Sequence, residues 1–439
     1  MKPSFCLFSL LTIFVLSAPS AAQDSPMFRG DPQHSGVYNS PGVPKLSGVK
    51  WKFHTAGRII SSPAIVNGTA YVGSTDTNLY AIDTATGTQK WKFTTGGWVV
   101  SSPAVSNGVV YFGSYDSFFY ALDAADGQLK WKFQTAGERR YAGKHLHHLE
   151  PAAETMPDPW DFFLSSPAVV NGTVFFGSGD GNIYALDAAT GAQKWRFQTG
   201  DVVHSSPAIV DNTLYIGSWD TYLYALDTAT GKEKGSFRTG DDPLVHNHIG
   251  IQSSPLLLDG VVYFGCRDAN VYAVDTSTGK QKWVFANEGS WVNNSPVIYG
   301  GKIYFGTSIP GILLALDAKT GAPVFQLPTG TPVFASMTIA GNTLYFGNFG
   351  GTLTAVDLTT QKVAWTFQTD GAKQNAGALL KEDGTFKFEA IFPSPNLFYD
   401  DMVVAVSKIL SMGSILSSPV VVGDTVYFGS ADGNLYALH

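Results

Sequence analysis

Short runs of alternating hydrophobic and polar residues recur along the chain. In the stretch 61–93, SSPAIVNGTAYVGSTDTNLYAIDTATGTQKWKF, four such runs are SPAIV, TAYVGS, NLYAID and QKWKF. Alternation with a period of two residues is typical of β-strands in stacked sheets. Asn67-Gly68 is a tight hairpin signal between the first two runs, and Gly87 can take the positive φ of a turn before the fourth. The stretch therefore predicts a four-stranded antiparallel sheet.

This stretch returns along the chain as a repeat. Its copies begin near Ser61, Ser101, Ser165, Ser205, Ser253, Asn294, Ala335 and Ser417, which makes eight. Successive copies are 40 to 42 residues apart, except where a longer segment intervenes. A period of about 40 residues made of short strands indicates propeller blades, an architecture like that of WD repeats. The sequence predicts an all-β, eight-bladed β-propeller of four-stranded antiparallel blades.

The two ends of the chain indicate how the ring closes. The last copy stops at NLYALH, after its third strand, and the segment VKWKFHTAG (49–57) precedes the first complete copy. Pairing of this N-terminal strand with the C-terminal blade would remove the exposed sheet edges. We expect a lead-in over 23–48 and a single propeller over 49–439, with rim insertions at 138–164 and 370–416.

The first 22 residues have the pattern of a secretory signal peptide. Lys2 supplies the positive start, FCLFSLLTIFVL the apolar core, and Ser20-Ala21-Ala22 the small residues for cleavage. This apolar run is too short for a permanent membrane span, and Cys6 lies ahead of it, so no lipidation cysteine stands at the cleavage point. Cleavage would leave Cys266 as the only thiol and exclude an internal disulfide. We expect a periplasmic or secreted monomer without a transmembrane segment.

Charge excludes one class of partner. The net charge is −7, or −8 without Lys2, and no basic run occurs anywhere in the chain. Proteins that bind nucleic acid usually carry a basic patch or stripe. We therefore expect no nucleic-acid partner.

The turn between the third and fourth strands carries a motif, A-x-D-x-x-T-G-x-x-x-W. It stands as AIDTATGTQKW, ALDAATGAQKW and AVDTSTGKQKW, and an opening segment SPMFRGDPQHSGVY precedes the repeats. The motif resembles the repeat of pyrroloquinoline-quinone (PQQ) enzyme propellers, over about residues 26–439. That family includes PQQ-dependent alcohol dehydrogenases and the propeller lipoprotein of the outer-membrane barrel assembly machinery. The chain departs from both: it has no adjacent cysteine pair, no C-x-x-C-H haem motif and no lipidation cysteine.

Residues that are present in every blade are expected to have a structural role within the blade. The aspartates of the motif are expected to bond the backbone of its turn, and its tryptophans to dock neighbouring blades. The tryptophan is replaced in two blades, by Gly235 and Phe325. The serines of the repeated SSP should face the central channel, again in a structural role.

Function should lie where the copies differ. In a four-stranded meander, the blade-to-blade links and the links between second and third strands open on the same side of the ring. That side should carry both insertions and the links 200–204, 217–220, 240–252, 265–268 and 287–293. The candidate ligand-binding residues in these segments are Arg139, Arg140, His145, His147, His148, His204, Trp219, His246, His248, Arg267, Asp268, Trp291 and Asn293.

The histidine cluster in GKHLHHLEPAAETMPDPWDFF (143–163) has three interpretations. It can be a metal site, because His145 and His147 point the same way in an extended segment with Glu150 nearby. It can be part of a rim that binds an anionic or quinone-like ligand. It can equally be a polar plug whose histidines bond the backbone and seal the channel.

The second insertion has mixed patterns. TFKFEAIF (385–392) reads as a strand, whereas YDDMVVAVSKILSMG (399–413) has apolar residues at helical spacing, with Asp400 or Asp401 as its cap. This insertion should cover the rim or dock a partner. Cys266, which replaces the serine of a repeated Gly-Ser, is expected to be a buried small residue.

These patterns favour a binding or scaffold module that holds an envelope protein or a small-molecule ligand at its insertion-bearing face, with no cofactor assured. The alternative, which the resemblance implies, is a PQQ- and Ca²⁺-dependent quinoprotein oxidoreductase acting on an alcohol or sugar. In it the quinone would stack on Trp219 or Trp291, arginines would hold its carboxylates, and Asp268 would act as base.

Overall fold

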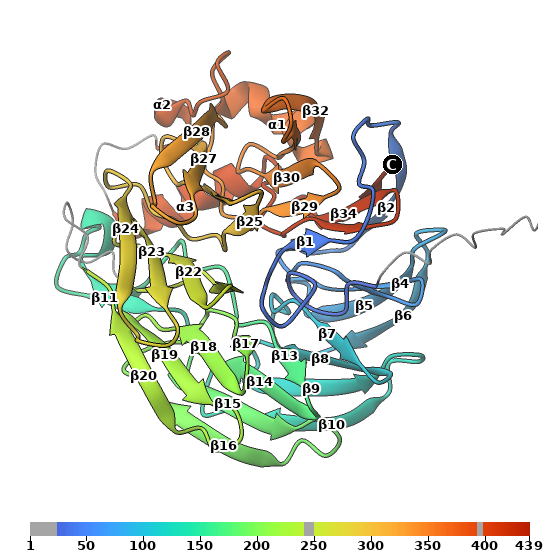
Figure 1. The fold of residues 1–439 in the computed structure, drawn as a ribbon. Helices are drawn as coiled ribbons and strands as arrows, with labels where there is room; N and C mark the ends of the chain where they lie inside the picture. Colours follow the sequence, from blue (N-terminus) through green and yellow to red (C-terminus); the bar gives the residue numbers. More distant parts are fainter. Residues whose placement is uncertain (1–23, 241–249, 393–397) are drawn as a thin grey trace, which may run out of the picture.

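The predicted strands form and assemble as a ring of blades around a central axis (Figure 1). The computed structural model describes residues 24–240, 250–392 and 398–439. Blades 1 to 4 consist of β3 (Ala64–Val66), β4 (Thr69–Gly73), β5 (Asn78–Asp83) and β6 (Gln89–Thr94); β7 (Ala104–Ser106), β8 (Val109–Gly113), β9 (Phe118–Asp123) and β10 (Leu129–Gln134); β13 (Ala168–Val170), β14 (Thr173–Gly177), β15 (Asn182–Asp187) and β16 (Gln193–Gln198); and β17 (Ala208–Val210), β18 (Thr213–Gly217), β19 (Tyr222–Asp227) and β20 (Glu233–Arg238).

Blades 5 to 8 complete the ring. They consist of β21 (Leu256–Leu258), β22 (Val261–Gly265), β23 (Asn270–Asp275) and β24 (Gln281–Ala286); β25 (Val297–Tyr299), β26 (Lys302–Gly306), β27 (Ile312–Asp317) and β28 (Pro323–Pro328); β29 (Thr338–Ala340), β30 (Thr343–Gly347), β31 (Thr352–Asp357) and β32 (Lys362–Gln368); and β33 (Val420–Val422), β34 (Thr425–Gly429), β35 (Asn434–Leu438) and β2 (Val49–His54). The eight-bladed prediction is confirmed.

Blade 8 is closed by the N-terminal strand, as expected. Its outermost strand is β2, which pairs antiparallel with β35 in the register Trp51↔Ala437 and Phe53↔Leu435. The backbone N–H of Ser47 extends the closure by donating to the His439 carbonyl at 2.6 Å. The first and last parts of the propeller thus share one sheet.

The repeated turn has the chemistry that its sequence indicates. In blade 1 the Oδ1 of Asp83 accepts from the backbone N–H groups of Ala85 and Thr86, each at 3.0 Å, and Gly87 has φ +72°. In blades 1, 2, 3, 5 and 8 the docking tryptophan reaches the next blade. In blade 1, for example, the indole N–H of Trp91 donates to the Ala124 carbonyl of blade 2 at 3.1 Å. The repeated aspartates and tryptophans are therefore scaffold residues.

The serines nearest the axis form a continuous circle. The backbone N–H of the second SSP serine in one blade donates to the hydroxyl of its counterpart in the next, at 2.9 to 3.1 Å. The circle runs through Ser62, Ser102, Ser166, Ser206, Ser254, Ser295, Ser336 and Ser418, and returns to Ser62. These hydrogen bonds confirm the structural role predicted for the serines.

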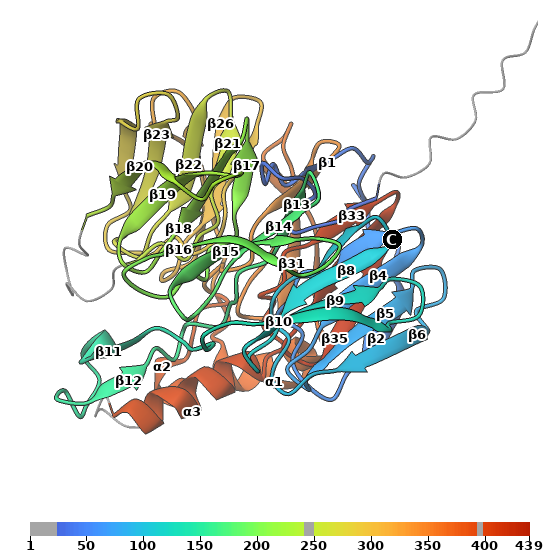
Figure 2. The same ribbon diagram turned by 90° about the horizontal axis from the view of Figure 1, so that it is seen from below.

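The lead-in covers one end of the channel. Its strand β1 (Val37–Tyr38) pairs parallel with β29. The buried guanidinium of Arg29 donates to the carbonyls of Pro296 and Met337 at 2.6 and 3.0 Å. Burial lowers the pKa of Arg29 to about 10. Figure 2 shows β1 at the end of the ring opposite to the helices.

Both insertions gather at the other end and form one lid (Figure 2). The first contains β11 (Ala142–Lys144), the short 3-10 helix η1 (Leu146–His148) and β12 (Thr155–Pro157); the second contains α1 (Asp370–Leu379), α2 (Phe388–Ile391) and α3 (Tyr399–Leu410). They are joined by the Tyr399 N–H, which donates to the Glu150 carbonyl at 2.9 Å. Leu149, Met156 and Phe162 of the first insertion share a buried hydrophobic cluster with α3.

Two expectations for the second insertion are wrong. The strand predicted over 385–392 is instead a single bridge, Leu380↔Phe386, followed by the helix α2. The helix predicted over 399–413 is α3, but its N-cap residue is Phe398, without a side-chain cap bond, and Asp400 and Asp401 lie in its first turn. Within the described part of the chain, the longest helices are too short and polar to cross a membrane.

Candidate functional site

Where the lid meets the channel mouth, a buried arginine lies between two tryptophans. The guanidinium carbon of Arg267 is 4.6 Å from the ring centroid of Trp219 and 4.2 Å from that of Trp291. Its Nη2 is 2.8 Å from Oδ2 of Asp158, and both side chains are almost fully buried. The link between the second and third strands of blade 5 thus supplies the cation, and the first insertion supplies its counter-ion.

Asp158 also holds a histidine of the insertion. Its Oδ1 lies 2.9 Å from Nε2 of His147 and accepts from the Trp160 N–H at 2.8 Å. Burial opposes ionisation of Asp158, but Arg267 and then His147 outweigh it and hold the pKa of Asp158 well below its usual range. Asp158 is therefore a carboxylate at neutral pH, satisfied by partners of this chain.

A second buried charge pair lies beside the first. Nδ1 of His204 is 2.9 Å from Oδ1 of Asp161, and its Nε2 is 3.4 Å from Oε1 of Glu138. Burial disfavours the His204 cation, but Asp161 and then Glu138 outweigh it and raise the pKa of His204 to about 10. Asp161 also accepts from the Tyr141 N–H at 2.8 Å and from the Gln252 amide at 3.2 Å. His204 is thus an imidazolium that fastens the insertion to the ring.

The stacking surface expected for a quinone is taken by the chain itself. The ring of Tyr141 lies 4.4 Å from that of Trp219, with an interplanar angle of 15°, and the guanidinium of Arg267 also lies over Trp219. The channel beneath keeps a cavity of about 40 Å³, lined by the serine circle, Gln252 and Asn293 among others. A cavity of this size accommodates a few water molecules. These residues do not fit a stacked quinone.

Asp268, considered above as a base, has a structural position. Its carboxylate accepts from the Tyr272 hydroxyl at 2.5 Å and from the N–H groups of Asn270 and Gly240, each at 3.0 Å. The same bond from a tyrosine four residues later occurs at Asp76, Asp116, Asp180, Asp220 and Asp432. The carboxylate of Asp268 is therefore explained by the repeat.

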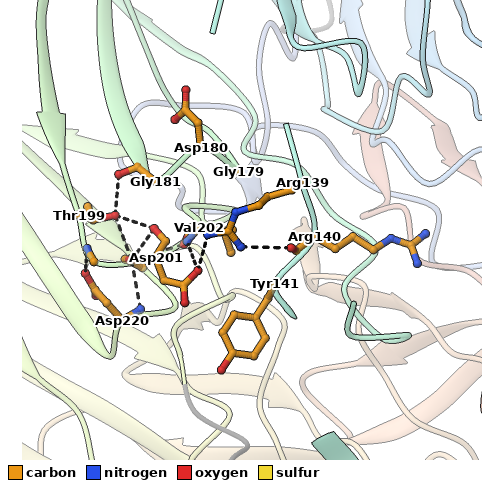
Figure 3. Close-up of polar contacts among 12 residues, drawn as sticks. Arg139, Arg140, Tyr141, Gly179, Asp180, Gly181, Thr199, Asp201, Val202 and Asp220 are labelled. Atoms are coloured by element: carbon orange, nitrogen blue, oxygen red, sulfur yellow. Dashed lines mark hydrogen bonds and ion pairs between the residues drawn. The ribbon is translucent and has the colours of Figure 1, made fainter. Parts of the chain in front are cut away.

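The two arginines before the first lid strand point to different neighbours (Figure 3). Nη2 of Arg139 pairs with Oδ1 of Asp201 at 3.0 Å, at a partly exposed position. The Arg140 side chain extends away from Arg139 and Tyr141 and lies 5.5 Å over the ring of Trp98. Arg139 therefore fixes the start of the insertion, whereas Arg140 borders an exposed aromatic residue.

The histidine cluster does not adopt the extended form assumed for a metal site. His145 and His147 have φ +52° and +57°, so the segment turns on itself. The rings of His145 and His148 are in edge contact at 5.4 Å, and Glu150 accepts from the Ala152 N–H at 2.6 Å. No group of three or more His, Cys, Asp or Glu side chains suited to a metal ion occurs among the described residues. His246 and His248 lie outside the described residues.

Cys266 is buried, as expected. Its thiol donates to the Gly250 carbonyl at 3.3 Å, and burial raises the pKa of Cys266 well above its usual range. The residue is thus a packed thiol.

Sequence reasoning missed the acidic residues that organise this region. They are Glu138, Asp158 and Asp161, together with Tyr141 and Gln252. Glu138, Tyr141, Asp158 and Asp161 had one visible signal, which is that they stand in an insertion without a counterpart in other copies. Gln252 stands directly before the repeated Ser-Ser-Pro, where other copies carry mostly apolar residues. Their partners could not be read from spacing, because the insertion folds back on blades 4 and 5.

Comparisons with known proteins identify a family and relatives that share this architecture. The family described as outer membrane protein assembly factor BamB matches residues 44–156, 147–306 and 286–386. The dehydrogenase subunit of a quinone-dependent alcohol dehydrogenase from Komagataeibacter europaeus is 38% identical over 95 residues, which are 18% of this chain and 13% of that protein. The chain thus matches only a small part of that relative's length.

Solved structures share the fold at low identity. BamB from Moraxella catarrhalis has a TM-score of 0.66 at 16% identity, over 90% of this chain and 100% of that one. The quinohemoprotein alcohol dehydrogenase from Comamonas testosteroni has a TM-score of 0.67 at 16% identity, over 94% and 80% of the two chains. The family match extends over most of the propeller, so this chain belongs to the BamB family of PQQ-repeat β-propellers.

Proposed function

We propose that this chain is a non-catalytic binding module that holds a protein partner on the outer surface of its lid. One observation carries the proposal. The lid fills the channel mouth with its own side chains and turns uncovered apolar residues outward. The partner would be a protein of the cell envelope, in line with the exported character expected from the signal peptide.

Helix α3 has two faces. Met402, Val406 and Ile409 face the hydrophobic cluster beneath. Val403 and Val404 are 44% and 52% exposed, and Phe398 immediately before the helix is 48% exposed. Val403 and Val404 on α3 and Phe398 next to it thus leave apolar surface exposed, and contiguous apolar surface of this kind marks interaction sites.

Arginines border this surface. Arg58 donates from Nη2 to the Ser407 hydroxyl on α3 at 3.3 Å. Arg140 lies over Trp98, which is 42% exposed. Arginine and aromatic residues are enriched in protein–protein interfaces. The surface therefore suits a partner segment with apolar side chains flanked by carboxylates.

Site-specific photocrosslinking tests the proposal. A photoreactive amino acid replaces Val404, or replaces Val324 on β28, which is 47% exposed and serves as the matched control. In cells of the natural host, position 404 should give one discrete protein adduct that position 324 does not. The adduct should disappear when Val403→Asp is added. Equal adduct patterns at both positions would contradict a docking role for the lid.

Reconstitution tests the dehydrogenase alternative. PQQ and Ca²⁺ added to the purified protein should give neither a bound-quinone absorption spectrum nor dye-linked alcohol oxidation, because Tyr141 and Arg267 cover Trp219. A stoichiometric quinone spectrum with alcohol oxidation would replace the binding module by a quinoprotein oxidoreductase.

A further inference from the structure

Blade 4 has no aromatic residue at the position where the other blades carry a tryptophan or, in blade 6, Phe325. The docking tryptophan pairs in register with an alanine of the third strand, as in Ala81↔Trp91 and Ala273↔Trp283. In blade 4 the same register pairs Ala225 with Gly235. Gly235 therefore stands in the tryptophan position, between blades 4 and 5.

The space of the missing ring stays open. In other blades a Cβ built on the turn glycine would meet the docking tryptophan ring at 2.6 to 2.8 Å, as at Gly87, Gly127, Gly191, Gly231 and Gly321. At Gly279, the turn glycine that faces blade 4, it would meet nothing within 4 Å. A cavity of about 280 Å³ lies there, with Gly235 and Gly279 both in its lining. We call this cavity the Gly235 slot.

The walls of the Gly235 slot keep the features that receive an indole elsewhere. Leu223, Val262 and Val274 provide apolar surface, and Tyr215 provides a ring. In blade 1 the corresponding ring, Tyr71, lies 5.8 Å from Trp91. Thr276 follows the turn aspartate as Ala124 does in blade 2, where the Ala124 carbonyl accepts the Trp91 indole N–H. The slot thus offers hydrophobic walls, a ring partner and one carbonyl acceptor.

An indole of this chain does not fill the slot. The ten tryptophans of the sequence are six docking residues, Trp51, Trp91, Trp131, Trp195, Trp283 and Trp365, and four residues on the lid side, Trp98, Trp160, Trp219 and Trp291. The residues that line the slot include none of them. A ring in the slot must therefore come from another molecule.

The charges at the rim distinguish a protein side chain from a free amino acid. The ammonium of Lys234 already bonds Thr213 at 2.9 Å and the Asn212 carbonyl at 3.0 Å. Oδ1 of Asp275 accepts from the N–H groups of Ser277 and Thr278. Since both charges are engaged, the rim offers little to the ammonium and carboxylate of free tryptophan. An indole within a peptide carries neither charge.

We propose that the Gly235 slot is a binding site for a tryptophan side chain presented by a partner protein. The indole would enter where the other blades place their own, with its N–H donating to the Thr276 carbonyl. The slot is separate from the lid. A negative result for this site would therefore leave the proposed lid-docking function untested, and a negative result for the lid would not affect this site.

Methyl NMR of the full chain tests the site. The probe is N-acetyl-L-tryptophanamide, and the observed groups are the methyls of Leu223, Val262 and Val274. We expect saturable shifts at millimolar probe, at least tenfold weaker binding of free L-tryptophan, and loss of both in Gly235→Trp. An unshifted spectrum, or shifts that persist in Gly235→Trp, would overturn the proposal. Equal or tighter binding of free tryptophan would overturn the assignment to a protein side chain.

A matched variant checks the geometry. Trp283→Gly should open an equivalent slot between blades 5 and 6, where Trp283 now donates to the Ala318 carbonyl at 3.0 Å. The probe should then also shift the methyls of Val271 and Leu316. Binding in this new slot without binding in the Gly235 slot would count against the proposal. If the variant fails to fold, the wild-type and Gly235→Trp titrations decide the question.

Discussion

Individual charged residues, in addition to the buried hydrophobic cluster, fasten the first insertion to the ring. Arg267 pairs with Asp158, and His204 lies between Asp161 and Glu138, all with little exposure. Buried charges remain ionised only when their partners compensate for the lost hydration. Each pair joins a residue of the ring to one of the insertion, so these charges contribute to holding the lid in place.

Because of the His204 pair, the free energy of unfolding should fall at alkaline pH. The pKa of His204 is about 10 in the folded protein, above its ordinary value of about 6.5, so its contribution is complete below pH ~6.5 and is lost as pH rises through about 10. Urea unfolding at a series of pH values should show the free energy of unfolding falling across this window. His204→Gln should cost about 3 kcal/mol at neutral pH and flatten the slope. His54→Gln, at an exposed position of β2, is the control and should keep the slope; an unchanged slope in His204→Gln would contradict the pairing.

Residue roles could be predicted from sequence only where a copy served as template. Asp83 and Trp91 recur, and their contacts repeat from blade to blade. Asp158 has no counterpart, and its partner Arg267 becomes adjacent only after the insertion has folded over blade 5. Trp219 was expected to offer a stacking face, yet Tyr141, which no pattern marked, covers it.

At the scale of elements, the local periodicity of apolar residues predicted an element correctly where the tertiary structure provided a surface for that element to pack against. The 3.6-residue spacing in 399–413 predicted α3, because the stripe of Met402, Val406 and Ile409 meets the hydrophobic cluster of the lid. The alternation in 385–392 failed because a strand needs a neighbouring edge, and here only Phe386 finds one, at Leu380. Asp400 and Asp401 do not cap α3, but their charges suit the first turn of a helix.

Helix α3 should respond very differently to changes on its two faces. Ile409→Ala removes a side chain that is 1% exposed and should lower the free energy of unfolding by about 2–5 kcal/mol through the cavity it leaves. Val404→Ala, at an exposed position, should change it by less than about 0.5 kcal/mol. Urea titration followed by tryptophan fluorescence measures both. Similar losses in the two variants would show that the outer face of α3 is packed.

At the scale of the whole molecule, the ring depends on a seam between its two ends. The ring of Trp51 on β2 lies 5.8 Å from that of Tyr427 on β34, and Phe53 pairs in register with Leu435 of β35. Blade 8 is the blade whose outer strand is held to its neighbour by non-covalent contacts alone, since no hairpin joins β2 to β35. Opening the seam would expose β35 as a sheet edge.

Weakening the seam should therefore cause association. Trp51→Ala combined with Phe53→Ala should produce concentration-dependent oligomers, visible by light scattering after size-exclusion chromatography. The control is Trp131→Ala with Phe133→Ala, which removes equivalent contacts in blade 2, where the outer strand β10 follows β9 directly. The control should lose stability yet stay monomeric. Oligomers of both variants at equal levels would show that the seam has no special role.

The serine circle has a consequence for chain connectivity. Every member donates one backbone hydrogen bond and accepts one, so each copy presents the same pair of groups to whichever copy comes next. The hydrogen bonds at the axis therefore do not distinguish a first blade from a last one. The order of the blades is set only by the links between them. A circular permutant that joins residue 439 to the lead-in and opens the chain at another blade-to-blade link would preserve every bond of the circle. The point at which the ring opens is thus a property of the rim and not of the axis.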